Sequence, residues 1–224
     1  MKATKTQLWI ILLTGLVCCD IMAVVDGMWQ PGYAIKSAVK LAVFGLMPLI
    51  TTSLWKLISF KELFIFQKKG FFTALGLGLG IYALILGGYF ALRNVFDFSQ
   101  IAGSLTENAG VTKENFLYVS LYISFVNSLL EEFFFRGFAY LTMAKFFRGA
   151  SLFSAVAFAL YHTAMMLGWF PPLIFLLALA GLTVGGLLFN WLNKKDGSIW
   201  TSWLVHMFAN FGINTVGFIL FSQT

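Results

Sequence analysis

The sequence predicts an all-α fold, a polytopic transmembrane helical bundle, from its composition and from the spacing of its apolar runs. Of the 224 residues, 59% are hydrophobic and only 11% are charged, whereas a soluble domain carries roughly 25% charged residues. Apolar runs of about 20 residues, the length that crosses a bilayer core, recur along the chain with short polar breaks. No stretch remains for a sizeable soluble domain.

The apolar runs predict about seven spans, with the catalytic core in the last four. The first run follows Lys2 and Lys5 as a signal peptide would, but no small-x-small cleavage motif comes after it, so we interpret it as a membrane helix. The predicted spans are Leu8–Val25, Ala38–Ser59, Phe71–Leu92, Phe116–Met143, Ser151–Trp169, Pro172–Leu192 and Ser198–Phe221.

The basic residues predict the orientation, because cytoplasmic loops are enriched in Lys and Arg. If the helices alternate, most basic residues fall on the side of the N-terminus, which we therefore place in the cytoplasm; the membrane is expected to be a bacterial cytoplasmic membrane. The net charge of +6 then reflects topology, and no nucleic-acid partner is expected. The cytoplasmic set is Lys2, Lys5, Lys56, Lys61, Lys68, Lys69, Lys145, Arg148, Lys194 and Lys195, and the opposite set is Lys36, Lys40, Arg93 and Lys113.

The chain is expected to form a single integral-membrane domain over residues 1–224. The longest polar break, Asp97–Asn115, separates plain front helices in residues 1–97 from a protease-like core in residues 116–221 that carries most of the ionisable residues within spans. The adjacent Cys18 and Cys19 are poorly placed for a disulfide with each other and match no metal or lipid-anchor motif, so we interpret them as small apolar filler.

Charged residues gather in the fourth span, where an ionisable side chain is costly and indicates a functional site. Glu132 and Arg136 are spaced i,i+4 with the acid first, the order that favours an ion pair. Glu131 lies about 100° around an α-helix from Glu132, so it has no charged partner on its own helix and stays available for chemistry or for a partner elsewhere. It continues a polar stripe that also contains Ser120, Ser124 and Asn127, which should face the bundle interior.

Both histidines of the chain fall within back-half spans. His162 shares a helix face with Phe158, and His206 shares one with Ser202, Asn210 and Asn214. With the predicted topology, Glu131, His162 and His206 all lie about 12–17 Å below the cytoplasmic surface, at 1.5 Å of rise per residue. The three side chains can therefore meet in one layer.

A carboxylate, two imidazoles and an amide in a semi-dry pocket suit amide hydrolysis. A base takes a proton from water, and imidazole or amide donors stabilise the oxyanion that forms when water adds to a carbonyl. Glu131, His162 and His206 could instead ligate zinc, but no HExxH motif places two histidines on one helical face. A metal-free site is favoured, and a divalent metal such as zinc stays open.

Three ordered motifs resemble the CPBP family of intramembrane proteases, which includes type II CAAX prenyl endopeptidases, bacteriocin-processing proteins and Abi proteins. Residues Glu131–Gly137 fit EExxxR, Phe158–His162 fit FxxxH and His206–Asn210 fit HxxxN, with no departure; Gly181–Gly185 and the Asp196–Trp200 turn also look like the family pattern. The resemblance implies that Glu131 activates water with His162 and that His206 and Asn210 stabilise the oxyanion. It further implies that Glu132 and Arg136 organise the site.

We therefore expect an intramembrane endopeptidase whose partners are the lipid bilayer and a substrate. The expected substrate is a membrane-associated peptide or protein, such as a peptide pheromone, a bacteriocin precursor or a membrane protein. The sequence does not choose among these substrates or define an oligomeric state. Two alternatives remain: a non-catalytic scaffold or immunity protein of the same fold, and a proton-coupled transporter that uses the buried acids as a relay. The transporter predicts paired repeats with broken helices, and the sequence shows no repeat.

Overall fold

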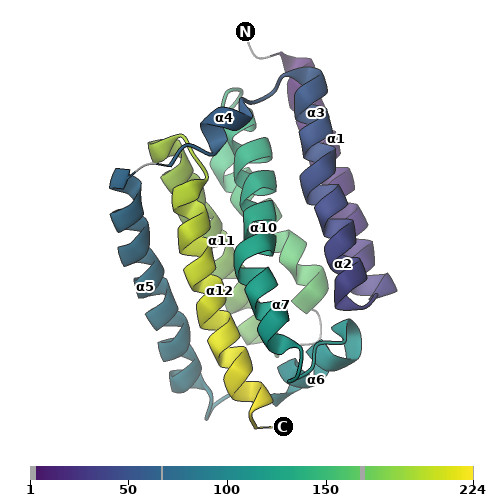
Figure 1. The fold of residues 1–224 in the computed structure, drawn as a ribbon, viewed down its shortest axis with the longest axis vertical. Coiled ribbons are helices and arrows are strands. Elements are labelled where there is room, and N and C mark those ends of the chain that lie inside the picture. Colours follow the sequence, from purple (N-terminus) through teal and green to yellow (C-terminus); the bar gives the residue numbers. More distant parts are fainter. Residues whose placement is uncertain (1–3, 67, 167–169, 224) are drawn as a thin grey trace.

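The computed structural model describes residues 4–66, 68–166 and 170–223, and within these ranges every regular element is a helix. Lys2, Trp169 at the end of the predicted fifth span and the outermost residues of the predicted domain lie outside them. Long helical segments run up and down side by side (Figure 1). The two chain ends lie at opposite ends of the bundle. The elements are α1 (Lys5–Val24), η1 (Val25–Trp29), α2 (Tyr33–Lys40), η2 (Leu41–Leu46), α3 (Met47–Trp55), α4 (Phe60–Leu63), α5 (Lys68–Leu92), α6 (Ser99–Ala109), α7 (Phe116–Tyr122), η3 (Ile123–Asn127), α8 (Ser128–Glu131), η4 (Glu132–Tyr140), α9 (Leu141–Met143), α10 (Ala150–Met166), α11 (Pro172–Asp196) and α12 (Trp200–Phe221).

Five helices in the described ranges are long and apolar enough to cross a membrane, which agrees with an integral membrane protein. α10 is apolar but shorter, and residues 116–143 form a continuous helical run that alternates between α and π turns, so the count of seven spans stays a prediction. The five are Lys5–Trp29, Tyr33–Trp55, Gly70–Leu92, Pro172–Asp196 and Trp200–Phe221.

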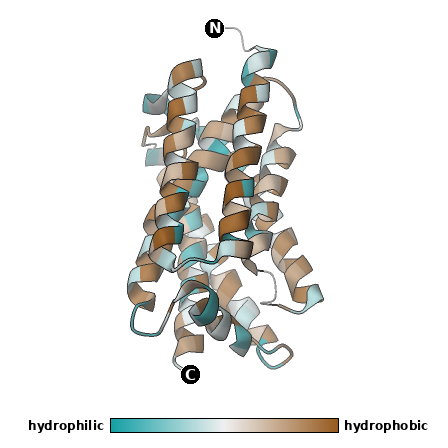
Figure 2. Ribbon diagram, turned by 90° about the vertical axis from the view of Figure 1, so that its right-hand side faces the viewer, coloured by the Kyte–Doolittle hydropathy of each residue, from teal (hydrophilic) through white to brown (hydrophobic). Residues whose placement is uncertain are grey.

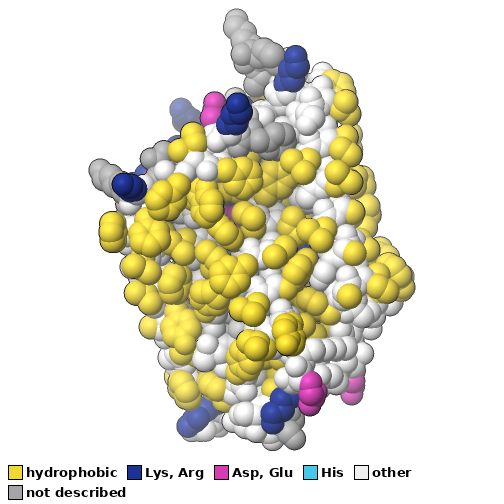
Figure 3. All heavy atoms as spheres, viewed as in Figure 1, with side chains coloured by type: hydrophobic (Ala, Val, Ile, Leu, Met, Phe, Trp, Pro, Cys, Tyr) yellow, Lys and Arg dark blue, Asp and Glu magenta, His cyan; other side chains and the backbone are white. Residues whose placement is uncertain are grey.

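The surface of the bundle is also that of a membrane protein. Phe72, Leu84 and Leu54 are each more than 70% exposed, as expected of side chains that face lipid. Figure 2 shows hydrophobic residues along the long helices and hydrophilic residues in the connections. In Figure 3 hydrophobic side chains cover the middle of the visible face, and charged side chains lie at its two ends.

Several helices contain wide π turns, in which a backbone N–H donates to the carbonyl five residues earlier. The N–H of Ser128 donates to Ile123, that of Leu141 to Arg136 and that of Met47 to Ala42. The expectation of a regular α-helix from Phe116 to Met143 is therefore wrong over residues 123–127 and 132–140. π turns are rare and frequently occur at functional sites, and here they flank Glu131.

Close contact between α10 and α11 depends on a glycine. A Cβ added to Gly186 would lie 2.9 Å from the Cα of Ala155, whereas one added to the adjacent Gly185 would meet nothing within 4 Å. Gly186 therefore lets the backbones of α10 and α11 approach, and α10 is the helix that carries His162.

The polar break between the two halves is partly ordered as a helix, which the sequence analysis did not predict. Within Asp97–Asn115, α6 ends at Gly110, whose φ of 64° is the left-handed conformation that glycine adopts readily. Ala102 and Ala109 on α6 join a core cluster with Phe116 at the start of α7. This packing closes the end of the bundle near the C-terminus (Figure 1).

The two cysteines of α1 are free thiols. Cys18 is buried within the main hydrophobic cluster and its thiol donates to the carbonyl of Val43 at 3.2 Å, and Cys19 is partly buried against the same cluster. Their packing agrees with the expected role as small filler between the front helices.

Candidate active site

The predicted convergence of Glu131 with the two histidines is present in the structure. Glu131 ends α8, Glu132 begins η4, and their exposed fractions are 2% and 0%. The Oε2 atom of Glu131 lies 3.8 Å from Nε2 of His162 on α10 and 3.6 Å from Nε2 of His206 on α12. Three separate helical segments therefore deliver one carboxylate oxygen and two imidazole nitrogens to a single point.

The other carboxylate oxygen of Glu131 is already occupied. Lys40 Nζ lies 2.5 Å from Oε1, and the Asn127 side-chain amide donates to the same atom at 3.0 Å. Glu131 is therefore not the unpaired acid of the leading interpretation; the alternative, a partner elsewhere in the chain, is the one present, and it comes from the second predicted span.

Lys40, predicted among the basic residues of the outer side, is instead buried within the bundle. It is only 6% exposed, at the end of α2 and within the candidate span Tyr33–Trp55. Its ammonium lies 5.0 Å from the ring centroid of Tyr161 and 5.6 Å from that of Phe44, which are cation–π distances. The available signal was an ionisable residue within a predicted span, Ala38–Ser59.

Glu132 and Arg136 form the predicted ion pair, at 3.4 Å between Oε1 and Nη1. Both side chains are fully buried, and the guanidinium lies 4.0 Å from the ring centroid of Phe158 and 4.9 Å from that of Phe189. None of the guanidinium nitrogens has a hydrogen-bond partner in the described part of the chain. Its charge is therefore stabilised by Glu132 and two aromatic faces, and Phe158, the first residue of the FxxxH motif, gains a structural explanation.

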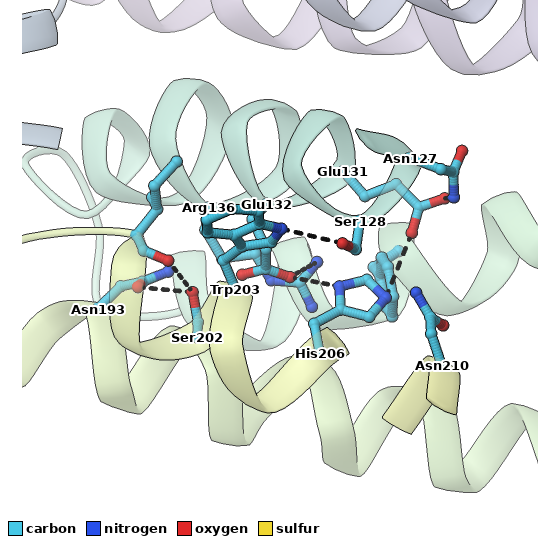
Figure 4. A network of polar contacts seen from close by, with 12 residues as sticks. Asn127, Ser128, Glu131, Glu132, Arg136, Asn193, Ser202, Trp203, His206 and Asn210 are labelled. Atoms are coloured by element: carbon cyan, nitrogen blue, oxygen red, sulfur yellow. Dashed lines mark hydrogen bonds and ion pairs between the residues drawn. The ribbon is translucent and has the colours of Figure 1, made fainter. Parts of the chain in front are cut away.

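The hydrogen bonds of the histidines define their protonation pattern. Nδ1 of His162 lies 2.7 Å from the carbonyl oxygen of Phe158, and Nδ1 of His206 lies 2.9 Å from Oε1 of Glu132. Because both partners are acceptors, each Nδ1 carries the proton and each Nε2 is directed at Glu131. Figure 4 shows His206 between the two carboxylates, with Asn210 one helical turn away.

Asn210 and Asn214 connect α12 to the wide turn of η3. The Asn210 amide donates to the Ile123 carbonyl at 3.1 Å, and the Asn214 amide donates to the Ser120 carbonyl at 3.1 Å and to the Ser124 hydroxyl at 3.0 Å. The predicted polar stripes of the two helices thus face each other. The Asn210 amide thus donates one N–H to the backbone of η3 and retains a second N–H.

The described residues contain no group of three or more His, Cys, Asp or Glu side chains placed to hold a metal ion. The carboxylates of Glu131 and Glu132 instead have the cations Lys40 and Arg136 beside them. The site therefore contains two buried carboxylates, each paired with a buried cation. Burying such a pair costs far less free energy than burying either charge alone.

The fold and the site define an integral membrane protein with a buried cluster of two glutamates and two histidines. Residues 113–212 match the family model described as type II CAAX prenyl endopeptidase Rce1-like, a span that includes all three motifs. This match supports membership of the CPBP family, which the motifs predict, and the matched family is one of proteases. No curated protein and no solved structure matches the chain significantly.

Proposed function

We propose that this protein is an intramembrane endopeptidase in which Glu131 activates the hydrolytic water. The observation that carries the proposal is the direction of Oε2 of Glu131 toward the Nε2 atoms of His162 and His206, at 3.8 and 3.6 Å. A neutral His162 with its proton on Nδ1 presents an acceptor at Nε2, so a donor such as water fits between it and the carboxylate.

The proposed reaction follows from these positions. Water bound at Oε2 loses a proton to Glu131 as its oxygen attacks the carbonyl carbon of the scissile peptide bond. The resulting oxyanion is stabilised by the second N–H of Asn210 and by His206, which Glu132 holds at Nδ1 and which donates from Nε2 in its imidazolium form. Glu131 then returns the proton to the leaving amine nitrogen, and the peptide bond breaks. In this scheme His162 orients the water, and Glu132 and Arg136 organise the site.

The proposed mechanism uses no metal. Lys40 already neutralises Glu131 at Oε1, and Arg136 does the same for Glu132. An added divalent ion would bring further positive charge to a site whose two acids are already balanced.

The proposed substrate is a membrane-associated peptide or protein. Glu131 and Glu132 are almost completely buried in a bundle whose middle is covered by hydrophobic side chains. A scissile peptide bond must therefore belong to a substrate that lies in the bilayer or at the membrane surface.

The function can be tested by quantitative membrane proteomics that compares cells with the wild-type protein and cells with Glu131→Gln. The amide keeps the shape of the side chain and removes the base, so the variant should accumulate uncleaved substrate. An Asn115→Gln variant, altered in the connection outside the site, is the matched control. Identical peptide termini in wild type and Glu131→Gln would contradict the proposal and favour a non-catalytic scaffold.

A further inference from the structure

We propose that Lys40 is a positioning residue for this hydrolysis: it holds Glu131 charged and directs its Oε2 atom at the histidines. The inference rests on the proposed function and extends it to the front half of the chain. Lys40 lies outside residues 113–212, the range that matches the family model, and outside all three motifs.

The two oxygens of Glu131 have different surroundings. Oε1 receives two donors at ordinary or short hydrogen-bond distance, Lys40 at 2.5 Å and Asn127 at 3.0 Å. Oε2 faces the two Nε2 atoms at distances that exceed a direct hydrogen bond. Lys40 and Asn127 therefore anchor one oxygen and leave the other directed at the place where water would react.

The ammonium of Lys40 is held in this position from several directions. Its side chain is 8% exposed, and the rings of Phe44 and Tyr161 lie within cation–π distance. The neighbouring basic residue one turn earlier, Lys36, instead pairs with Asp26 at 2.8 Å. Two lysines on the same helix thus have separate acidic partners: Lys36 pairs with Asp26, and Lys40 pairs with Glu131.

A buried carboxylate loses its charge readily when a nearby cation is removed, because a low dielectric disfavours the ionised form. Without Lys40, Glu131 would share its surroundings with imidazoles and with a second carboxylate, and a protonated Glu131 cannot accept a proton from water. The ionisable groups that surround Glu131 are Lys40, His162, His206, Glu132, Arg136, Tyr33, Tyr122 and Tyr161.

The test compares Lys40→Met with Lys36→Met in the purified full-length protein, on a substrate peptide found by the proteomic comparison. Lys36→Met removes a lysine and an ion pair from the same helix without touching Glu131, so it should keep wild-type kcat. Lys40→Met should lower kcat by about 100-fold, the scale of a misplaced catalytic group, with KM unchanged. Its activity should also recover more slowly as pH rises, so that the acid limb of the profile moves to higher pH.

Lys40→Gln is measured in parallel because it keeps an N–H donor for Oε1 and preserves the packing better. A folded Lys40→Gln or Lys40→Met protein with wild-type kcat and pH profile would overturn the proposal. Glu131→Gln separates this failure from that of the function itself: inactive Glu131→Gln with fully active Lys40 variants rejects only the role of Lys40, whereas active Glu131→Gln rejects the mechanism.

Discussion

Replacing Arg136 with Met should destabilise the protein strongly, because it leaves Glu132 buried without its cation. Both side chains of the pair are 0% exposed, and removal of one partner of a buried pair costs about 3–5 kcal/mol. His206 would still donate to Glu132 at 2.9 Å, so we expect a loss in the free energy of unfolding near the lower end, about 3 kcal/mol.

The assay is reversible unfolding in mixed detergent micelles, with two comparison variants. Arg148→Met removes an arginine that is exposed at the end of the bundle and should leave the free energy of unfolding almost unchanged. Glu132→Gln/Arg136→Met removes both charges and should recover much of the loss, because no unpaired charge remains. A loss below about 1 kcal/mol for Arg136→Met, the value of a weak surface pair, would refute the reasoning.

Two further predictions concern packing and metal dependence. Gly186→Ala should destabilise the protein by about 1–3 kcal/mol, because its methyl group would meet the Ala155 backbone. Gly185→Ala, with open space around it, should instead be neutral or gain up to about 1 kcal/mol from helix propensity; equal effects in unfolding experiments would disprove the close approach. Dialysis of the purified enzyme against EDTA should leave kcat/KM unchanged, and a loss that added Zn²⁺ restores would establish a metal mechanism.

Much of the fold could be predicted because hydrophobic length and helical spacing are local properties. Apolar runs located the long helices, and the i,i+4 rule identified the Glu132–Arg136 pair that the structure contains. The common depth of Glu131, His162 and His206 needed only the alternation of helices and the rise per residue. These inferences depend on neighbours in sequence or on simple topology.

The features that were missed depend on contacts between distant segments. Lys40 and Glu131 are separated by 91 positions, so their pairing requires the rotation and register of two helices against each other. The π turns of η3 and η4 likewise depend on backbone hydrogen bonds that side-chain patterns do not specify. Both features change the interpretation of Glu131, from a free acid on a regular helix to a clamped acid beside wide turns.

The most direct measurement is the rate at which purified Glu131→Gln cleaves the substrate peptide identified in membranes, compared with wild type and with Lys36→Met under the same conditions. The proposed mechanism predicts that Glu131→Gln is folded but shows no detectable hydrolysis, because an amide cannot take the proton from water, while Lys36→Met retains wild-type activity. Hydrolysis by folded Glu131→Gln at the wild-type rate would contradict the assignment of Glu131 as the general base.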